Sequence, residues 1–256
     1  MQKNKLATLH NAVLILRIFT KEQPDLNLTE ISKGIGLNVS STKRLVNTLL
    51  QQGFLQKNHK TKRYMLGYSL LSLCGIIKAT MEIHKEAKPV MEQLARELGV
   101  AIHLGILEGT EIVYLEKVES TYPLRLFSHI GKKNPAYCTG CGKIMLAFQK
   151  PSLLESTLTL IESEGYYPYG ENTVIHSEEL LQHLVKIKRQ GYSVCYNEFH
   201  EGVSIGAPIY NYTGEVIASI SATGPNSHIH IQDIPHFTKH IVDAGKVISK
   251  KLGYYF

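Results

Sequence analysis

The stretch of residues 38–53, NVSSTKRLVNTLLQQG, constrains the fold of this chain more than any other. After its basic first turns, apolar residues recur at helical spacing at Leu45, Val46, Leu49 and Leu50. Asn38 or Ser40 can cap the start of such a helix, and Gly53 stands where a glycine commonly ends one. The pattern predicts a helix with one buried stripe and an N-terminal end suited to phosphates and base edges. We interpret it as a DNA-recognition helix.

Two further helices are predicted before this one, over residues 8–20 and 29–34. Apolar residues recur at three- and four-residue steps in the first, and Pro24 marks the break after it. Gly36 lies in the turn between the second helix and the recognition helix. Two short helices joined by a glycine turn are typical of a helix-turn-helix.

A basic hairpin follows the recognition helix. Apolar arms at residues 54–57 and 63–66 flank the polar tip NHKTK, which predicts a hairpin. A solvated charged loop is the alternative; we favour a wing, because the hairpin follows the helix directly and ends at Gly67, where a new helix begins. The candidate DNA-binding residues are Thr29, Asn38, Ser40, Ser41, Thr42, Lys43, Arg44, Asn47, Lys57, Lys60, Lys62 and Arg63.

Charge is distributed unevenly along the 256 residues. Residues 1–70 contain 11 Lys or Arg and 3 Asp or Glu, a net charge of +8, whereas residues 71–256 contain 17 and 19, a net charge of −2. A basic head that binds a polyanion and a near-neutral body are therefore expected. The length suits two domains, and 43% hydrophobic residues suffice for a globular core.

Several classes of protein are excluded by what the sequence lacks. The first 20 residues lack the apolar core and cleavage site of a signal peptide, and no run approaches the roughly 18 apolar residues of a membrane span. Four cysteines are too few for a disulfide scaffold of this size. We expect a cytoplasmic protein with no membrane partner.

The rest of the chain predicts an α+β body with a central sheet. Residues 68–81 form an apolar helix, which is either a linker helix buried in a dimer contact or an ordinary core helix. An amphipathic helix over residues 83–98 follows, ended by Gly99. Strands are predicted at residues 101–107, 112–118, 124–127, 203–210 and 216–222, and helices at 143–149, 180–190 and 234–252.

With these elements in place, the chain resembles the IclR family of bacterial transcriptional regulators along nearly its whole length. The N-terminal resemblance rests on LTEISKGIGLNVSSTKRLVNTLLQQGFL and RYMLG. The C-terminal resemblance rests on PAYCTGCGKIMLAF, RQGYSVCYNEFHEGV, IGAPIYNYTGEVIASISATGP and the ending ISKKLG. A single block would be weak evidence, but all of them in this order are specific.

The resemblance implies a winged helix-turn-helix domain at residues 6–67, a linker helix at 68–81, and a GAF-like α/β effector-binding and oligomerisation domain at 82–256. It also implies a homodimer or tetramer that binds a palindromic double-stranded DNA operator and a small-molecule effector, more often as a repressor than as an activator. It implies neither an enzyme nor a cofactor.

The family's effector pocket is lined by the loop before the GK helix, the end of the G-Y strand and the last strand pair. In this chain these positions are Thr139, Gly140, Cys141, Cys195, Ser204, Ser221 and Thr223. Ser221 and Thr223 share one face of a strand. Gly140 would let a carboxylate approach backbone N–H groups near a helix start. Donors of this kind, with no Lys or Arg nearby, suit a small organic anion or a neutral polar ligand.

The chain departs from the family pattern at two places. Cys195 stands where many members carry an acidic residue, with Asn197 two positions later. The segment between Glu198 and Ser204 is also one residue short. For these reasons we carry over no particular ligand from the family.

Cys138 and Cys141 form a C-x-x-C, but no second pair of that kind completes a zinc site, and we assign no metal. One hypothesis is that Cys141 and Cys195, with His103 nearby, sense a soft metal or a thiol-reactive compound. Another is a thiol enzyme with either cysteine as nucleophile and His103 as base. We favour cysteines that serve as small apolar wall residues.

Two other clusters have a plain and a functional interpretation. His228 and His230 in NSHIHIQD could chelate a metal on a strand, but a solvated loop is favoured. The run Tyr166-Tyr167-Pro168-Tyr169 could close a lid over a pocket, and we slightly favour packing on the surface of the body.

Overall fold

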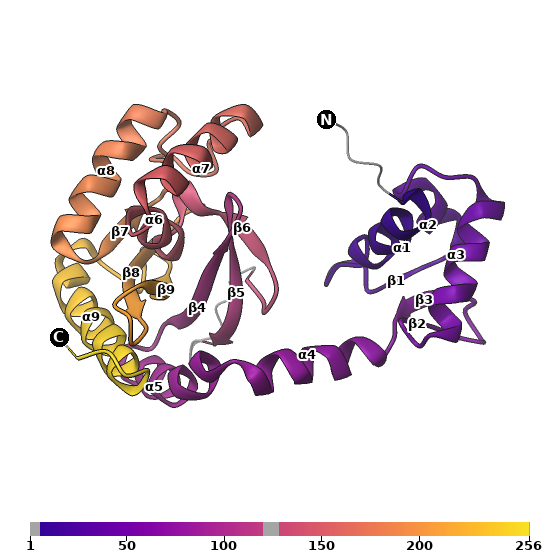
Figure 1. Ribbon diagram of the computed structural model, residues 1–256, viewed down its shortest axis with the longest axis horizontal. Coiled ribbons are helices and arrows are strands. Elements are labelled where there is room, and N and C mark those ends of the chain that lie inside the picture. Colours follow the sequence, from indigo (N-terminus) through magenta and orange to yellow (C-terminus); the bar gives the residue numbers. More distant parts are fainter. Residues whose placement is uncertain (1–5, 120–127, 256) are drawn as a thin grey trace. The chain divides into compact units, whose positions relative to one another are not determined.

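The computed structural model describes residues 6–119 and 128–255. By its internal contacts the chain divides into two compact units, Met1–Thr80 and Met81–Phe256, and each is described here by itself (Figure 1). The predicted strand at residues 124–127 lies outside the described residues.

The first unit is a helix-turn-helix with a wing. Helices α1 (Ala7–Arg17), α2 (Leu28–Gly34) and α3 (Val39–Gln51) pack around Ile15, Ile31 and Val46, none of which is exposed. Strands β2 (Leu55–Lys57) and β3 (Tyr64–Leu66) form the predicted hairpin. Strand β1 (Asp25–Leu26) pairs with β3 on the side away from β2. The sequence predicted only the end of a helix at this place.

Local hydrogen bonds define both ends of the recognition helix. The side chain of Asn38 accepts from the N–H of Ser41 at 2.8 Å, so Asn38 rather than Ser40 caps α3. Gly53 has a φ of +71°, the left-handed conformation that favours glycine just past a helix end. Helix α2 starts with a reciprocal capping box between Asn27 and Glu30.

Helix α4 (Ser69–Thr80) has no buried residue, although it is strongly apolar. Leu71, Ile76 and Ile77 are all more than half exposed. The alternative of an ordinary core helix is therefore wrong for the single chain.

The second unit is built on an antiparallel sheet that, within the described residues, has six strands in the order β6-β5-β4-β9-β8-β7. These strands are β4 (Ala101–Glu108), β5 (Glu111–Val118), β6 (Lys133–Pro135), β7 (Ser193–Tyr196), β8 (Val203–Tyr210) and β9 (Val216–Gly224). Its helices are α5 (Glu82–Leu98), α6 (Gly140–Ala147), α7 (Pro151–Glu164), α8 (Ser177–Gln190) and α9 (Ile234–Lys251), with short 3-10 turns at Ala136–Cys138 and Ile231–Asp233.

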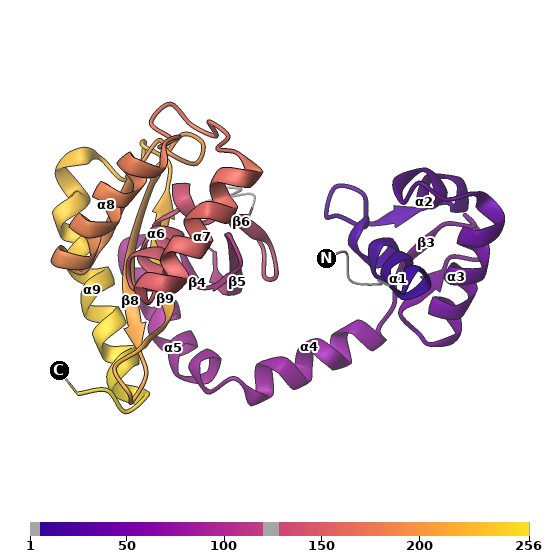
Figure 2. The same cartoon turned by 45° about the horizontal axis from the view of Figure 1, so that its top comes forward.

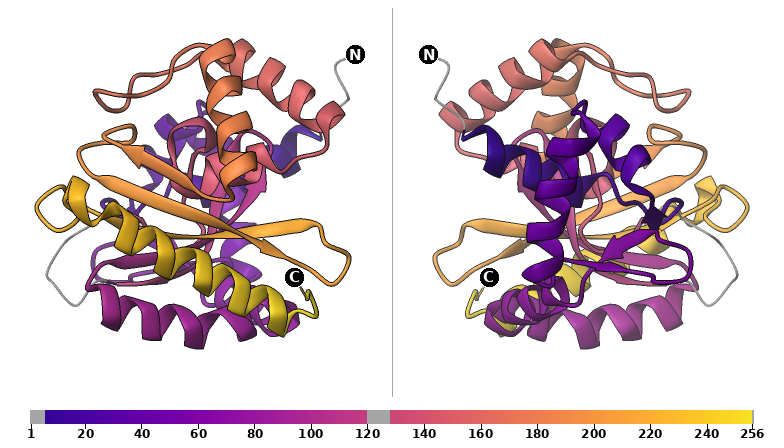
Figure 3. Two further views of the ribbon diagram at one scale, coloured as in Figure 1. Left: turned by 90° about the vertical axis from the view of Figure 1, so that its left-hand side faces the viewer. Right: turned by 90° about the vertical axis from the view of Figure 1, so that its right-hand side faces the viewer.

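Helices cover both faces of this sheet. Helices α5 and α9 lie on one face, and α6 lies on the other with α8 packed outside it (Figure 2). Figure 3 shows α9 lying over the part of the sheet formed by β8 and β9. Helix α7 was not predicted, and α6 begins three residues earlier than predicted because Thr139 caps it.

Alternation along the strands makes the two faces chemically different. Ile102, Ile205 and Ile220 point to the α5 and α9 side with other aliphatic residues. The opposite face carries small or polar residues at His103, Gly105, Ser193, Cys195, Ser204, Gly206, Ser219, Ser221 and Thr223. This second face is where α6 packs.

Gly67, between the wing and α4, leaves no room for a side chain. A Cβ there would lie 2.0 Å from the carbonyl oxygen of Gly53, which is backbone and cannot rotate away. We expect Gly67→Ala to destabilise the first unit by about 1–3 kcal/mol. Gly75→Ala in α4 is the matched control, because nothing lies within 4 Å of its added Cβ, and we expect it to be neutral or stabilising by up to about 1 kcal/mol. Urea unfolding followed by far-UV circular dichroism measures both, and equal effects would contradict this account.

Candidate functional site

The solvent-facing side of α3 carries the basic and hydroxyl residues predicted to meet DNA. Ser40, Ser41, Lys43, Arg44 and Asn47 are exposed, and the first turn of the helix holds no acidic residue. Thr29, at the start of α2, is exposed as well. The first unit thus presents a cationic helix face with several hydrogen-bond donors.

Two predicted DNA contacts have structural roles instead. Thr42 is fully buried and donates its hydroxyl to the carbonyl oxygen of Asn38 at 2.9 Å, so it does not face solvent. Arg63 binds Asp25 Oδ1 at 2.6 Å and Glu30 Oε2 at 2.9 Å, which ties the wing to β1 and α2. Its charge is therefore matched within the unit. Neither role was visible in the sequence, because the partners of Arg63 lie 38 and 33 residues away.

The tip of the wing keeps its lysines exposed. Asn58 accepts from the N–H of Lys60 and of Thr61, which shapes the turn. Lys62 adopts a φ of 59°, and both Lys60 and Lys62 are exposed. Lys57 is half-buried, with its ammonium 5.1 Å from the centre of the Tyr64 ring.

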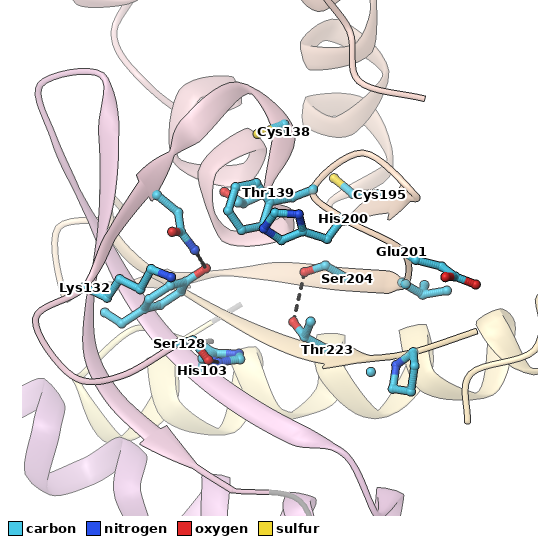
Figure 4. A pocket seen from close by; sticks show the side chains of 17 residues that line it. His103, Ser128, Lys132, Cys138, Thr139, Cys195, His200, Glu201, Ser204 and Thr223 are labelled. Carbon is cyan, nitrogen blue, oxygen red and sulfur yellow. Dashed lines mark hydrogen bonds between the residues drawn. The ribbon is translucent and has the colours of Figure 1, made fainter. Parts of the chain in front are cut away.

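A cavity of about 400 Å³ opens in the second unit on the polar face of the sheet, beyond the first turn of α6 (Figure 4). Of the predicted effector residues, Thr139, Cys195, Ser204 and Thr223 line it. His103 and Cys138, which the sequence analysis singled out for other reasons, line it as well. The remaining lining residues were not singled out in the sequence; they are Tyr114, Ser128, Lys132, Asn134, Phe199, His200, Glu201, Gly202, Val203, Gly224 and Pro225.

The other three predicted positions, Gly140, Cys141 and Ser221, are not among the lining residues. The thiol of Cys141 lies 3.2 Å from Ser221 Oγ, underneath α6. The carbonyl of Gly140 accepts from the hydroxyl of Ser193 at 2.8 Å. These groups join α6 to the sheet, so the structure places them behind the cavity wall.

The wall formed by β4 and β5 holds neutral hydrogen-bonding groups. His103 Nε2 lies 2.8 Å from Ser128 Oγ, and burial lowers the pKa of His103 to about 3, so its ring is neutral at pH 7. Burial also raises the pKa of Tyr114, which keeps its hydroxyl protonated. Asn134 Nδ2 donates to that hydroxyl at 3.4 Å.

Lys132 also lines the cavity, which corrects the expectation that no Lys or Arg lies near the ligand. It lies in the segment before β6 (Figure 4), and its carbonyl oxygen accepts from the N–H of Tyr114 at 3.2 Å. The only sequence signal for it was its place shortly before the PAYCTGCGK block, in a segment without a predicted role.

The segment between β7 and β8 forms one rim of the cavity. Asn197 and His200 have φ values of 53° and 60°, which are uncommon for residues other than glycine. Asn197 Oδ1 accepts from the N–H of Gly202 at 2.9 Å and from Asn226 Nδ2 at 3.0 Å. These bonds hold the strained turn in place.

A buried ion pair anchors this rim to α6. Lys143 Nζ lies 2.5 Å from Glu198 Oε2 and 3.1 Å from His183 Nδ1. Burial raises the pKa of Glu198, and the charge of Lys143 opposes that shift. Separating the two groups would leave each charge buried without its partner, which is destabilising. The pair therefore holds Glu198, and with it the start of the rim, against α6.

The cysteines show no sign of reactivity. Burial raises the pKa of Cys138, Cys141 and Cys195, so all three remain thiols at neutral pH. Among the residues that the structure describes, no group of three or more His, Cys, Asp or Glu side chains could hold a metal ion. With a pKa of about 3, His103 is too weak a base to take a proton from thiols whose pKa is raised. The geometry favours cysteines as wall residues.

The structure agrees with the loop interpretation of the histidine pair and with the packing interpretation of the tyrosine run. His228 and His230 lie in the loop between β9 and the turn at Ile231–Asp233 rather than on a strand. Tyr137 donates its hydroxyl to the carbonyl oxygen of Tyr167 and accepts from its N–H, which packs the tyrosine run onto the body. Tyr169 reaches the cavity rim, where its ring centre lies 5.1 Å from that of Phe199.

A winged helix-turn-helix unit and an α/β unit with a cavity of about 400 Å³ define a class: DNA-binding transcriptional regulators with a ligand-binding C-terminal domain. Comparison with known families agrees. Residues 8–59 match the IclR helix-turn-helix domain, and residues 77–250 match the C-terminal domain of the bacterial transcriptional regulator IclR. The chain belongs to the IclR family.

Characterised relatives and solved structures span the same length. The chain is 33% identical to the HTH-type transcriptional regulator KipR of Bacillus subtilis, over 98% of this chain and 99% of KipR. It is 25% identical to the transcriptional repressor IclR of Escherichia coli, covering 97% and 91%. The Thermotoga maritima IclR structure has a TM-score of 0.78 at 28% identity, covering 98% and 100%. A Microbacterium hydrocarbonoxydans IclR homolog solved with 4-hydroxybenzoate has a TM-score of 0.84 at 23% identity, covering 96% and 98%.

These relatives are named as regulators and not as enzymes, so the thiol-enzyme alternative is wrong. Across residues 6–119 and 128–255, no helix combines the length and apolarity needed to cross a membrane.

Lys60 lies in the wing tip and Arg63 lies three residues after it, but the two should respond differently to truncation. Arg63→Ala removes the ties to Asp25 and Glu30, so we expect a lower Tm of the first unit with no change in the salt dependence of DNA binding. Lys60→Ala should leave the Tm unchanged and lower the slope of log K against log salt by about 0.9, as the loss of one phosphate contact does. Thermal melts and anisotropy titrations at several salt concentrations separate the two, and a reversed pattern would refute the assignment.

The neutral, buried state of His103 should make stability depend on pH. Its folded-state pKa of about 3 lies below the ordinary histidine value of 6.5, so the unfolded chain binds the extra proton first and stability is lost as pH falls below about 6.5. Relative to His103→Gln, the wild type should lose about 2 kcal/mol between pH 7.5 and pH 5. Urea unfolding across this range tests the prediction, and parallel pH curves for the two proteins would rule it out.

Proposed function

We propose that this protein is a repressor that binds a palindromic operator through α3 and the wing, and that a small organic acid in the cavity of the second unit controls its affinity for DNA. The observation that carries the proposal is the pairing of an exposed basic recognition helix with a ligand-sized cavity in one chain.

Repression is the proposed sign of regulation because the chain resembles a named repressor, IclR of Escherichia coli, over 97% of its length. An organic acid is proposed because the lining combines donors with the cation of Lys132. The Microbacterium homolog, which shares the fold, was solved with the acid 4-hydroxybenzoate. A regulator of bacterial genes acts in the cytoplasm, where its DNA lies.

We propose that the working form is a homodimer or a dimer of dimers. Helix α4 supports this, since Leu71 and Ile76 expose apolar side chains that a second copy would cover. Two-fold symmetry matches a palindromic operator, whose half-sites lie about 34 Å apart for two recognition helices in successive major grooves.

Control by the ligand would be a coupling free energy between the cavity and the DNA-binding units. An effector that binds one arrangement of the dimer better shifts the population toward that arrangement. If this arrangement sets the spacing of the two recognition helices differently, operator affinity changes without any contact between ligand and DNA.

The first test is a fluorescence-anisotropy titration on the DNA upstream of the protein's own gene, against scrambled DNA, at fixed salt. We expect a preference of about a thousandfold or more for the specific DNA. Arg44→Ala should weaken specific binding by about 10- to 100-fold, because an arginine that contacts a base contributes about 1–3 kcal/mol of discrimination. Arg189→Ala, an exposed arginine on α8, is the matched control and should bind like the wild type.

Lys60→Ala should weaken binding to specific and scrambled DNA alike, as the loss of a phosphate contact would. Absence of any binding at low salt, or equal losses for Arg44→Ala on both DNAs, would overturn the proposed interface.

A further inference from the structure

Helix α9 carries two histidines one turn apart on a side that is open to solvent. His236 and His240 are separated by four residues, so they lie on the same side of the helix. His236 is exposed, His240 is half-buried, and α9 lies on the outside of the second unit (Figure 3). The centres of their rings are 4.3 Å apart. This is the spacing with which a helix brings two imidazoles to one metal ion.

A hydrogen bond to the backbone prepares His240 to act as a ligand. Its Nδ1 lies 2.9 Å from the carbonyl oxygen of His236. Because a carbonyl oxygen only accepts, Nδ1 carries the proton, and the neutral ring keeps its lone pair on Nε2. Histidines that bind metals almost always donate their other ring N–H to a carbonyl or a carboxylate, which fixes both the tautomer and the orientation of the ring.

The two rings are close enough to share one ion. Zinc binds an imidazole nitrogen at about 2.0–2.1 Å, and a tetrahedral angle at the metal then separates two such nitrogens by about 3.4 Å. Rings whose centres are 4.3 Å apart reach this separation by rotation about side-chain bonds. The exposed side chain of His236 is free to rotate in this way without displacing the core.

The charged neighbours on α9 favour a cation overall. Asp233 lies three residues before His236 and Asp243 three residues after His240, so both carboxylates lie on the histidine side of the helix. Lys239 is exposed beside the two rings and opposes them. Two negative charges and one positive charge leave a net charge of −1 on these three residues.

The two histidines make an open site. Among residues 6–119 and 128–255, no third His, Cys, Asp or Glu side chain joins them in one group that could hold a metal ion. Water would therefore fill the other positions of a bound ion, as it does wherever a protein supplies fewer ligands than the metal takes. Such an ion binds reversibly, unlike the ion of a closed structural zinc site.

We propose that His236 and His240 form a bidentate site for a divalent transition metal, with Zn²⁺ as the ion. Neutral imidazole nitrogens suit Zn²⁺, Cu²⁺ and Ni²⁺, whereas Mg²⁺ and Ca²⁺ prefer oxygen ligands. Helix α9 packs on the face of the sheet opposite α6, so the site is separate from the cavity. It takes no ligand from the DNA-binding unit and is therefore independent of the proposed function.

The test is isothermal titration calorimetry of the full chain with ZnCl₂, without DNA, in a buffer that does not chelate metal ions. For the wild type we expect saturable binding of one ion per chain. His236→Gln and His240→Gln should each weaken binding at least tenfold, because a single imidazole remains. CuCl₂ should bind more tightly than ZnCl₂, and MgCl₂ should not bind at this site.

Two further variants control for the charge and for the histidine itself. His176→Gln removes an exposed histidine just before α8 and should bind Zn²⁺ like the wild type. Lys239→Gln keeps both ligands but removes the opposing cation, so it should bind Zn²⁺ severalfold more tightly. Circular dichroism spectra of all variants confirm that the fold is intact.

Electron paramagnetic resonance of the Cu²⁺ complex identifies the ligands directly. The wild type should show splitting from two imidazole nitrogens, and each single variant splitting from one. Three results would overturn the proposal: no Zn²⁺ binding by the wild type, binding that survives replacement of both histidines, or half an ion per chain with a doubled mass in light scattering. The last result would make the site one that two copies share.

Discussion

The second unit depends on the close packing of α6 against the polar face of its sheet. Gly206 allows the approach, since a Cβ there would lie 2.6 Å from the carbonyl oxygen of Gly140. Serine hydroxyls then bond to the backbone of the helix: Ser193 to Gly140 and Ser219 to Cys141. Such bonds satisfy buried polar groups that would otherwise destabilise the core. The cavity is the part of this face that the eight-residue helix leaves uncovered.

This packing explains why the cavity is well defined. The buried pair of Lys143 and Glu198 joins α6 to the rim that follows β7. Asn197 holds the same rim to the loop after β9 through its bond with Asn226. A ligand that contacts the rim thus touches a segment fixed at both ends, which is the preorganisation that selective binding needs. In the first unit, Arg63 likewise fixes the wing to β1 and α2, which precede it in the chain.

Much of the fold followed from local patterns. The recognition helix, the wing, the long amphipathic helix at residues 82–98 and the last strand pair were all predicted, because each has a clear period and clear end signals such as Gly53 and Gly99. The elements that were missed are short or weakly periodic. Strand β1 has two residues and β6 has three, and pairing with a neighbouring strand, not local preference, determines them.

The cavity shows where local patterns stop being informative. Ser221 and Thr223 do share a face of β9, as their spacing predicted, yet only Thr223 lines the cavity because α6 covers Ser221. Lys132 and Phe199 line it although nothing in their local sequence marks them, since segments 67 residues apart meet only in the folded chain.

The sequence by itself therefore determined the class of this protein: a basic recognition helix, a wing and an α+β body are consequences of residue periodicity and charge. Tertiary structure alone decided which side chains are available. It buried Thr42, paired Arg63 with two carboxylates of its own unit and brought Lys132 to the cavity. The physical reason is that periodicity determines which face of an element a residue occupies, whereas packing against distant elements determines what covers that face.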